Sequence, residues 1–398
     1  MKKMLTLLLT VLLCLPCAFS LAEKTERETF TSGDYEYVLL DDGTAEITRY
    51  RGEAETLEVP DELDGYAVTA IGDQAFLLCA SLTQVAIPDS VTAIGVNPFV
   101  SCFNLSNIIV SPDHPALATI DSVLFSKADQ RLVCYPQALT ASEYSIPMGT
   151  QLIGDWAFSN CESLTQITIP DSVTAVGDGA FAGCDSLTSV AIPDSVTTIG
   201  DAAFQQSGLS QITIPNSVID IGVQAFCFCS GLTQITIPDS VTTIGDAIFC
   251  GSGLKQVTIP NSVTTIGMRA FGSCLNLTQI VIPDSVTDIG NAAFEDCMNL
   301  RQITIPDSVT DIGSAAFKGC FMLTQITIPD SITTIKDQTF KGCFNLTQIT
   351  VPDSVTDIGD QTFEGCDSLT SVIVGHDSYT EQYCIDNNLP YAYPEGND

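Results

Sequence analysis

The sequence predicts a solenoid of stacked coils, in which each coil contributes parallel β-strands and buries its apolar side chains against its neighbours. Three features recur with one period of 22 or 23 residues, and such a period is typical of repeat architectures. The first is a phenylalanine, the second is a proline that follows an apolar pair, and the third is a cysteine three residues after most of the phenylalanines. The phenylalanines are Phe76, Phe99, Phe158, Phe181, Phe204, Phe226, Phe249, Phe271, Phe294, Phe317, Phe340 and Phe363.

The chain begins with a pattern typical of a secretory signal. Two lysines precede an apolar run from Leu5 to Leu15, and small residues at 20–22 provide a cleavage site before Glu23. The apolar run is too short to span a bilayer. We therefore expect residues 1–22 to be a signal peptide and the remaining chain to be secreted, with possible retention at the cell surface.

Residues 23–70 resemble the repeat only near their end, and we expect them to form an N-terminal β cap. The segment from Tyr35 to Tyr50 alternates apolar and polar residues around an Asp-Asp-Gly turn, which is the pattern of a β-hairpin. Such a hairpin would cover the first coil of a solenoid spanning 71–374, because the end of a solenoid core must be sealed.

One repeat, at 164–187, shows how each coil is expected to fold. Leu164, Ile167 and Ile169 follow the L-x-x-L-x-L spacing of a leucine-rich-repeat strand and are expected to point inward. Pro170 ends the strand because it has no N–H to donate to the next coil. A second short inward-facing segment follows, and then a short helical turn that carries Phe181. Each coil is thus predicted to be strand, turn, short strand and helical turn.

Two segments depart from the repeat. The prolines Pro88 and Pro147 lie one repeat plus 36 residues apart, and we expect an inserted strand pair at about 112–146. After Val374 the pattern stops, and Ser378 is placed to cap a short helix. We expect residues 375–398 to form a small helical C-terminal cap.

The cysteines are expected to be buried free thiols. Equivalent residues of stacked coils lie about 4.8 Å apart with parallel side chains, whereas a disulfide needs Cβ atoms about 3.8 Å apart. Two coils are one residue shorter and carry Ser207 and Ser252 in the cysteine position, which indicates a small residue packed in a turn. Cys227 and Cys250 form a separate pair directly after the repeat phenylalanine, and the sequence leaves open whether they are bridged or reduced.

Charge and motif content exclude several functions. The chain has 14 Lys and Arg against 48 Asp and Glu, a net charge of -34, and this excess of acid disfavours nucleic acid and anionic membranes as partners. It also has no later segment apolar enough for membrane insertion. The two histidines, His114 and His376, are far apart along the stack, and we expect both in surface loops. No catalytic, phosphate-binding or metal motif is present, so we expect neither an enzyme nor a cofactor.

The repeat string L-x-x-I-x-I-P-x-x-V-T-x-I-G-x-x-A-F-x-x-C resembles the BspA-like leucine-rich repeats of secreted and surface proteins, mostly bacterial. The hairpin before the first coil, the inserted segment and the Ser-Tyr-Thr-Glu-Gln-Tyr terminus resemble parts that often accompany these repeats, and together they cover nearly all of 30–394. The resemblance implies a binding role, such as adhesion to host matrix proteins or to another cell surface, and it brings no catalytic residues.

The differences between repeats point to a candidate partner-binding site. The position after the repeat cysteine is small or acidic in several coils, but in four consecutive coils it is apolar. Lys318 and Lys341 lie three residues before two of these apolar positions. An apolar stripe edged by cations on an acidic protein indicates a protein-binding site, unless these side chains fold down as additional core. The four apolar residues are Leu275, Met298, Phe321 and Phe344.

Two other rows provide alternative functions. The outward strand positions repeat Thr-Gln-Thr, and this face is suited to binding a glycan or to building a surface layer, although it also fits simple strand propensity. The aspartates that follow the prolines stack at coil spacing and are suited to weak Ca²⁺ binding, although each is equally expected to cap its own turn. These aspartates are Asp89, Asp171, Asp194, Asp239, Asp284, Asp307, Asp330 and Asp353.

Overall fold

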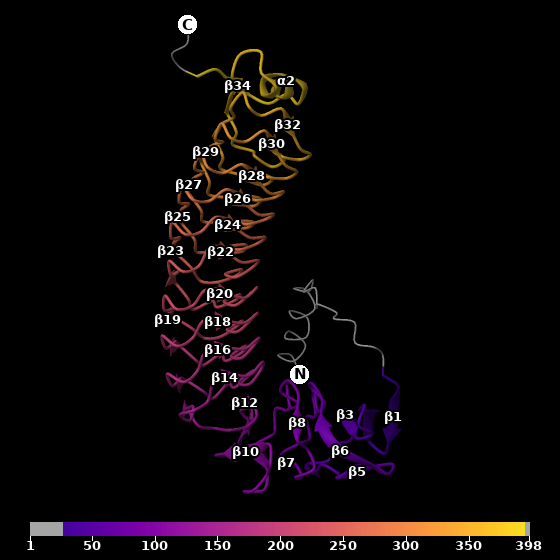
Figure 1. Cartoon of the computed structure of the whole chain (residues 1–398). Helices are drawn as coiled ribbons and strands as arrows, with labels where there is room; N and C mark the ends of the chain where they lie inside the picture. The colour runs from indigo at the N-terminus through magenta and orange to yellow at the C-terminus, as the bar shows by residue number, and fades with distance from the viewer. Residues whose placement is uncertain (1–26, 395–398) are drawn as a thin grey trace.

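A computed structural model describes residues 27–394, and it confirms the predicted solenoid of stacked parallel coils (Figure 1). The signal peptide predicted at 1–22 lies outside the described residues. Within 27–394, no helix has the length and apolar character needed to cross a membrane.

The N-terminal cap is a small mixed sheet that closes the first coil. Strands β1 (Thr29–Ser32), β2 (Tyr35–Leu39) and β3 (Ala45–Tyr50) form an antiparallel meander, which includes the predicted hairpin. Strand β3 then pairs in parallel with β6 (Tyr66–Ile71), and β6 pairs with β5 (Glu62–Leu63) and with β8 (Ala93–Ile94). The solenoid therefore begins at β6, where the strand pairing changes from antiparallel to parallel.

On the other side of these first coils, three strands form a parallel sheet: β4 (Thr56–Glu58), β7 (Gln84–Ala86) and β9 (Asn107–Ile109). Between this sheet and the main stack, the inserted segment forms the antiparallel hairpin β10 (Leu117–Ile120) and β11 (Val123–Ser126), and a third strand, β12 (Arg131–Cys134). Strand β12 pairs in parallel with the first short strand of the main stack, so the insert also begins the second part of the solenoid.

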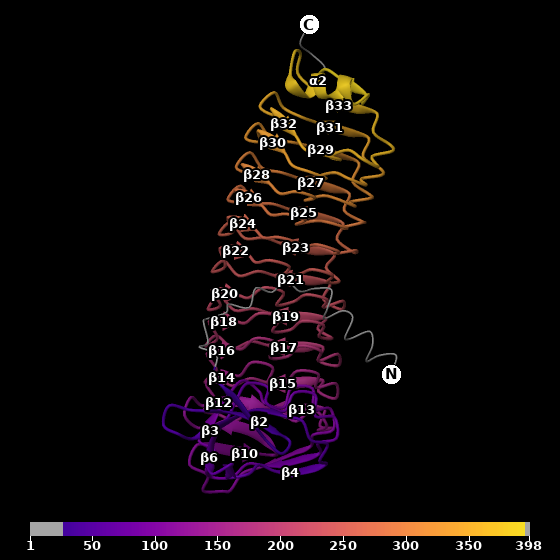
Figure 2. The same ribbon diagram turned by 90° about the vertical axis from the view of Figure 1, so that its right-hand side faces the viewer.

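In the main stack each coil carries one three-residue strand and one two-residue strand, which form separate rows (Figure 2). The three-residue strands are β13 (Glu143–Ser145), β15 (Gln166–Thr168), β17 (Ser189–Ala191), β19 (Gln211–Thr213), β21 (Gln234–Thr236), β23 (Gln256–Thr258), β25 (Gln279–Val281), β27 (Gln302–Thr304), β29 (Gln325–Thr327), β31 (Gln348–Thr350) and β33 (Ser371–Ile373). The two-residue strands are β14 (Leu152–Ile153), β16 (Ala175–Val176), β18 (Thr198–Ile199), β20 (Asp220–Ile221), β22 (Thr243–Ile244), β24 (Thr265–Ile266), β26 (Asp288–Ile289), β28 (Asp311–Ile312), β30 (Thr334–Ile335) and β32 (Asp357–Ile358).

The stack ends in a helix and one more strand. Helix α2 (Tyr379–Asp386) begins after Ser378, whose hydroxyl accepts a hydrogen bond from the Glu381 N–H at 3.1 Å, as its sequence position predicted. Strand β34 (Tyr391–Ala392) then pairs in parallel with β33. Together they cover the last coil and bury Cys384.

Stacked aromatic rings form the centre of the core. From Phe158 to Phe363 the ring centroids of successive coils are 5.1 to 6.0 Å apart. Tyr135 of the insert occupies the phenylalanine position in front of Phe158, at a centroid distance of 5.2 Å. Phe76 and Phe99 belong to a separate stack that starts at Tyr50, and the molecule accordingly has two hydrophobic clusters.

The segment that carries each phenylalanine consists of tight turns, not of a continuous helix. Around Phe294, for example, Ala292 and Asp296 adopt positive φ angles of 54° and 57°. Because the backbone alternates in this way, the Phe294 N–H donates to the Ala316 carbonyl of the next coil at 2.8 Å, while the Cys297 N–H donates back to the Phe294 carbonyl at 3.2 Å. The turns thus add a hydrogen-bonded ladder between coils on the side opposite the strands.

The cysteine row is part of the same ladder. Within residues 27–394 all cysteines are free, and those of the row are buried except Cys79, which is partly buried. The thiol of one coil donates to the phenylalanine carbonyl of the coil before it, as Cys297 does to Phe271 at 3.1 Å and Cys320 does to Phe294 at 3.2 Å. Where serine replaces cysteine, Ser207 and Ser252 contact the thiol of the next coil at 3.4 Å. The prediction of buried free thiols is confirmed.

Candidate functional site

The four residues of the predicted apolar stripe lie on successive turns at the edge of the main stack. Their exposed fractions are 46% for Leu275, 36% for Met298 and 43% for Phe344, whereas Phe321 is partly buried. The Phe321 and Phe344 rings pack against each other with centroids 4.8 Å apart. These side chains therefore cover one another along the stack and leave apolar surface in contact with water.

The backbone holds this stripe in a fixed position. The amide of Asn299 donates to the Leu275 carbonyl at 2.7 Å, and the amide of Asn345 donates to the Phe321 carbonyl at 2.8 Å. Between them, the Met322 N–H donates to the Met298 carbonyl at 3.1 Å. Leu275, Met298 and Phe321 are thus tied to the next coil through their own carbonyls, and a preorganised surface loses less conformational entropy when it binds.

The two lysines expected beside the stripe belong to a row of charges that directly follows the repeat phenylalanines. We call Glu295, Lys318, Lys341 and Glu364 the paired-charge row. The Lys318 ammonium lies 2.8 Å from Glu295, and the Lys341 ammonium lies 3.2 Å from Glu364. From the neighbouring coil, Arg269 reaches Glu295 at 2.7 Å. The cations beside the apolar stripe are therefore each paired with a carboxylate.

Glu295 is the centre of this row. Its side chain is 11% exposed, while the two cations that contact it are more exposed. Burial acts to raise the pKa of the Glu295 carboxyl, but hydrogen bonds from Lys318 and Arg269 outweigh burial and leave that pKa below its usual value. The carboxylate is therefore ionised at neutral pH and holds two cations beside the stripe.

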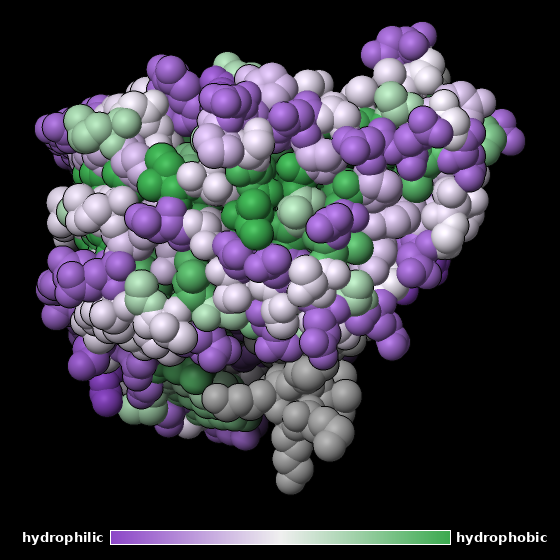
Figure 3. All heavy atoms as spheres, turned by 90° about the horizontal axis from the view of Figure 1, so that it is seen from below, coloured by the Kyte–Doolittle hydropathy of each residue, from purple (hydrophilic) through white to green (hydrophobic). Residues whose placement is uncertain are grey.

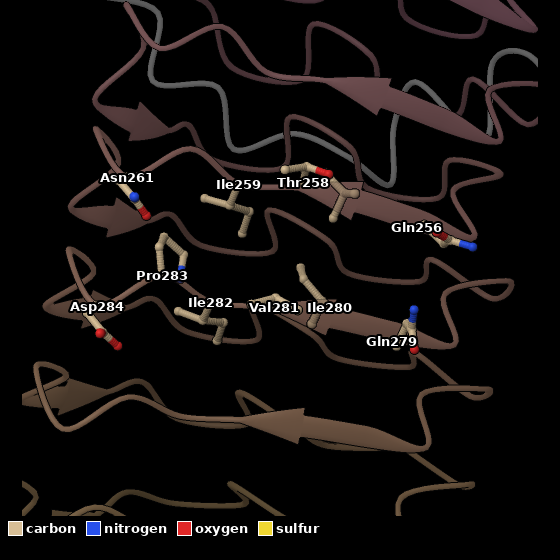
Figure 4. A pocket seen from close by; sticks show the side chains of 11 residues that line it. Gln256, Thr258, Ile259, Asn261, Gln279, Ile280, Val281, Ile282, Pro283 and Asp284 are labelled. Carbon is tan, nitrogen blue, oxygen red and sulfur yellow. The ribbon is translucent and has the colours of Figure 1, made fainter.

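The Gln/Thr face, formed by the outward side chains of the three-residue strands, is exposed as predicted. In strand after strand the Gln and Thr positions are exposed and the central Ile is buried, as in β21 and β27. Val281 takes a Thr position in β25 and is 75% exposed. Beside it, an open depression lies between β23 and β25, with Gln256 and Gln279 at one end and Asn261 and Asp284 at the other (Figure 4).

The aspartates after the prolines are exposed, in a row along one edge. Carboxylates that accept backbone N–H groups across coils belong instead to a different row, directly after the repeat glycine. For example, Asp155 accepts from the Asp178 N–H at 2.9 Å, and Asp178 accepts from the Asp201 N–H at 2.8 Å. Among the described residues, no group of three or more His, Cys, Asp or Glu side chains is placed to hold a metal ion.

The prediction of a surface loop for His114 is wrong. The His114 ring is fully buried in the insert, where its Nε2 lies 3.0 Å from the Pro88 carbonyl and its Nδ1 accepts from the Leu117 N–H at 3.0 Å. These two contacts place the proton on Nε2 and use both ring nitrogens. His114 is therefore a structural residue that ties the insert to an earlier coil.

Sequence reasoning missed a second apolar edge near the N-terminus. Leu77, Leu78 and Phe103 are 44%, 56% and 38% exposed. Phe103 directly follows Cys102 and therefore occupies the same repeat position as Phe321 and Phe344. The repeat register could thus have indicated this apolar edge. A view from below shows apolar side chains grouped among polar ones on this end of the molecule (Figure 3).

The family model described as BspA type leucine rich repeat region matches residues 54–146, 151–278 and 264–389 of this chain. Among curated proteins, none matches the chain.

Several solved structures share the fold, including the following three. A leucine rich cell surface protein from Faecalibacterium prausnitzii is 30% identical over 90% of this chain and 97% of its own, with a TM-score of 0.54. A leucine-rich repeat protein from Bacteroides ovatus is 28% identical over 92% of this chain and 100% of its own, with a TM-score of 0.61. The pneumococcal vaccine antigen PcpA is 17% identical over 93% of this chain and 99% of its own, with a TM-score of 0.58, and at this identity the match shows the fold alone.

Proposed function

Because the chain belongs to the family of BspA-type leucine-rich-repeat proteins, we propose that it is a secreted or cell-surface binding protein that attaches to a host matrix protein or to a protein on another cell. The observation that carries this proposal is the apolar stripe, whose exposed side chains are fixed by hydrogen bonds between coils. The name of the Faecalibacterium prausnitzii protein, which is similar over nearly the whole chain, supports the surface location.

The stripe has the composition of a binding surface. Aromatic residues and Met are enriched at protein interfaces, and a cluster of them surrounded by polar groups commonly provides most of the binding energy. In three coils a member of the paired-charge row lies three residues before a stripe residue, and the row supplies such polar groups. The surface is otherwise strongly acidic, whereas this row carries two lysines and two glutamates, so a partner meets less net repulsion beside it.

The experiment measures binding of the purified chain to a panel of extracellular-matrix proteins, with the double variant Phe321→Ser/Phe344→Ser. We expect this variant to bind at least about 30-fold more weakly, since hot-spot truncations cost about 2 kcal/mol or more. Circular dichroism and thermal unfolding report whether the coils still stack. Phe103→Ser is the matched control, because it alters the same repeat position in the N-terminal coils and is expected to leave binding unchanged.

A second stripe variant keeps the test decisive if the double variant unfolds. Leu275→Asp lies at the other end of the stripe, where the side chain is 46% exposed, and it introduces a charge without opening the core. Binding that survives Leu275→Asp in a folded protein contradicts the proposal, as does equal loss of binding in Phe103→Ser.

The Gln/Thr face supports a second candidate function, binding of a carbohydrate or assembly of a surface layer. Exposed Gln and Thr side chains repeat along the face, and the depression between β23 and β25 interrupts their flat row with polar groups at both ends. Glycan-array binding that persists in Phe321→Ser/Phe344→Ser and is lost in Gln256→Ala/Gln279→Ala favours this candidate over the first.

A further inference from the structure

The two rows of strands are interrupted at two places, after β19 and β20 and again after β27 and β28, and the first of these lies in the middle of the stack. One sheet ends at β19 and the next begins at β21, and in the other row one sheet ends at β20 and the next begins at β22. One coil further on, the strand side is continuous again, with the Thr264 N–H donating to the Thr242 carbonyl at 2.9 Å. The coils that contain β19 and β21 are therefore neighbours with weakened strand-side pairing.

On the turn side the same two coils remain firmly joined. The Phe226 N–H donates to the Ile248 carbonyl at 2.9 Å, and the Phe228 N–H donates to the Cys250 carbonyl at 2.7 Å. The Phe226 and Phe249 rings stack with centroids 5.8 Å apart. The turn side thus acts as the fixed edge between these coils, while on the strand side the backbone ladders are interrupted and the Ser240 hydroxyl donates to the Val218 carbonyl.

Cys227 and Cys250 face each other across this junction. Each directly follows the repeat phenylalanine of its coil, so the two share one register position, the one that the paired-charge row occupies further along. Cys227 is buried and Cys250 is partly exposed. The Cys227 thiol donates a hydrogen bond to Cys250, so the two sulfur atoms already point toward one another.

The surroundings make Cys250 the more reactive thiol of the two. The hydrogen bond from Cys227 lowers the pKa of Cys250, burial opposes this effect, and the Arg269 guanidinium lowers the pKa further. At Cys274, a buried member of the cysteine row, the direction is opposite, and burial raises the pKa to about 12. Because the thiolate is the nucleophile, a partly exposed cysteine with a lowered pKa reacts much faster than a buried one with a raised pKa.

We propose that Cys227 and Cys250 form a reversible thiol–disulfide site that reacts with low-molecular-weight disulfides. When this site is oxidised, a disulfide bond links the two coils covalently. The Cys250 thiolate attacks one sulfur of the small disulfide, forms a mixed disulfide and releases one small thiolate. Cys227 then loses its proton and attacks the Cys250 sulfur, which releases the second small thiol. The protein loses two electrons and two protons, and the small disulfide is reduced to two thiols.

At this junction an interrupted strand ladder coincides with a cysteine at the same register position of both coils, and this combination favours the bond. Stacked coils place equivalent Cα atoms about 4.8 Å apart, within the range of about 4.4 to 6.8 Å found in disulfides. What a regular stack lacks is the closer Cβ approach of about 3.8 Å. Since the strand ladders between these two coils are interrupted, a small tilt about the turn side can bring the two Cβ atoms closer together.

Cys79 and Cys102 form the nearest comparison in the molecule. Cys79 is also partly buried, and a hydrogen bond from Cys102 lowers its pKa. However, Cys102 lies in the cysteine row and its thiol contacts the Phe76 carbonyl at 3.0 Å, while β7 and β9 pair continuously beside it. Cys79 therefore lacks an adjustable junction, and we do not expect a bridge there.

The test treats the folded full chain with oxidised glutathione and maps the thiols by mass spectrometry after cleavage before aspartate. Asp239 and Asp246 lie between the two cysteines, so the cleavage separates Cys227 from Cys250 unless they are linked. We expect two thiols to be lost and a link between the peptides that contain residues 227 and 250, which a reducing agent reverses. In Cys227→Ser we expect a stable glutathione adduct at Cys250, and in Cys250→Ser no reaction at either position.

The control variants are Cys229→Ser and Cys274→Ser, which remove row cysteines from the same two peptides and are expected to leave the link intact. A link that disappears in either control variant, a link at Cys79 and Cys102 instead, or a folded chain that loses no thiols overturns the proposal. The test uses no binding partner, so its result is independent of the matrix-binding measurements.

Discussion

The coils before and after strand β23 have the same core but different surfaces. Phe181 in the first group and Phe294 in the second are both fully buried and stacked on both sides. At the position after the repeat cysteine, the first group has the exposed acidic residues Glu162 and Asp185, while the second has the apolar stripe. The fold therefore requires the phenylalanine and tolerates almost any side chain four residues later, so the second group can carry a binding surface without cost to the core.

The largest expected effect concerns the shared core. Phe181→Ala and Phe294→Ala should each destabilise the chain by about 3 to 5 kcal/mol, because each removes a buried ring and leaves a cavity between two others. Urea unfolding followed by circular dichroism measures both variants under the same conditions. A loss at one site that exceeds the other several-fold contradicts the view that the two groups of coils have equivalent cores.

A smaller effect is expected from the charges that distinguish the second group. Glu295→Gln should cost roughly 1.5 to 3 kcal/mol at neutral pH, because it removes charged hydrogen bonds to Lys318 and Arg269. The pKa of Glu295 is lowered in the folded chain, so its stabilisation is present above the unfolded value of about 4.3 and is lost as pH falls through the lower folded value. The difference in Tm between the variant and the unmodified chain should therefore shrink as the pH falls below the unfolded value.

Glu364→Gln is the matched control for this measurement. Glu364 also pairs with a lysine, but its side chain is 54% exposed and it contacts that single cation. An exposed ion pair contributes about 0 to 1 kcal/mol, and salt screens it further. If the two variants lose the same stability, the burial of Glu295 does not strengthen its ion pairs, and the paired-charge row contributes no more than exposed surface pairs do.

The repeat period made the core predictable. A phenylalanine at fixed register must occupy the same place in every coil, and a cysteine three residues later must lie in the next turn. The repeat register also predicts the paired-charge row, which the sequence analysis did not identify as a whole. All four of its residues directly follow a repeat phenylalanine and must stack as neighbours: Glu295, Lys318, Lys341 and Glu364. The same argument placed the four residues of the apolar stripe in one row, although it left open whether their side chains point outward or fold inward.

Other features could not be predicted because they depend on contacts outside the period. Tyr135 takes a phenylalanine position although its neighbours in sequence do not match the repeat, and His114 is buried by contacts with Pro88 that the sequence does not indicate. The interruption between β19 and β21 depends on small tilts between coils of almost the same sequence. Such tilts change hydrogen bonding without changing which residues are neighbours.

The smallest expected effect concerns calcium and the exposed aspartate row, which also differs between the two groups of coils. Asn216 and Asn261 interrupt the row around β21, whereas four consecutive coils of the second group carry Asp284, Asp307, Asp330 and Asp353. Neighbouring carboxylates at coil spacing repel by about 1 kcal/mol in water-like surroundings, and dissolved salt reduces this further. We therefore expect millimolar Ca²⁺ to move the Tm by less than about 1 °C beyond NaCl of equal ionic strength, because so weak a repulsion leaves little for a cation to relieve. A larger, saturable rise that Asp307→Asn/Asp330→Asn removes would instead establish a calcium site confined to the coils that also carry the stripe.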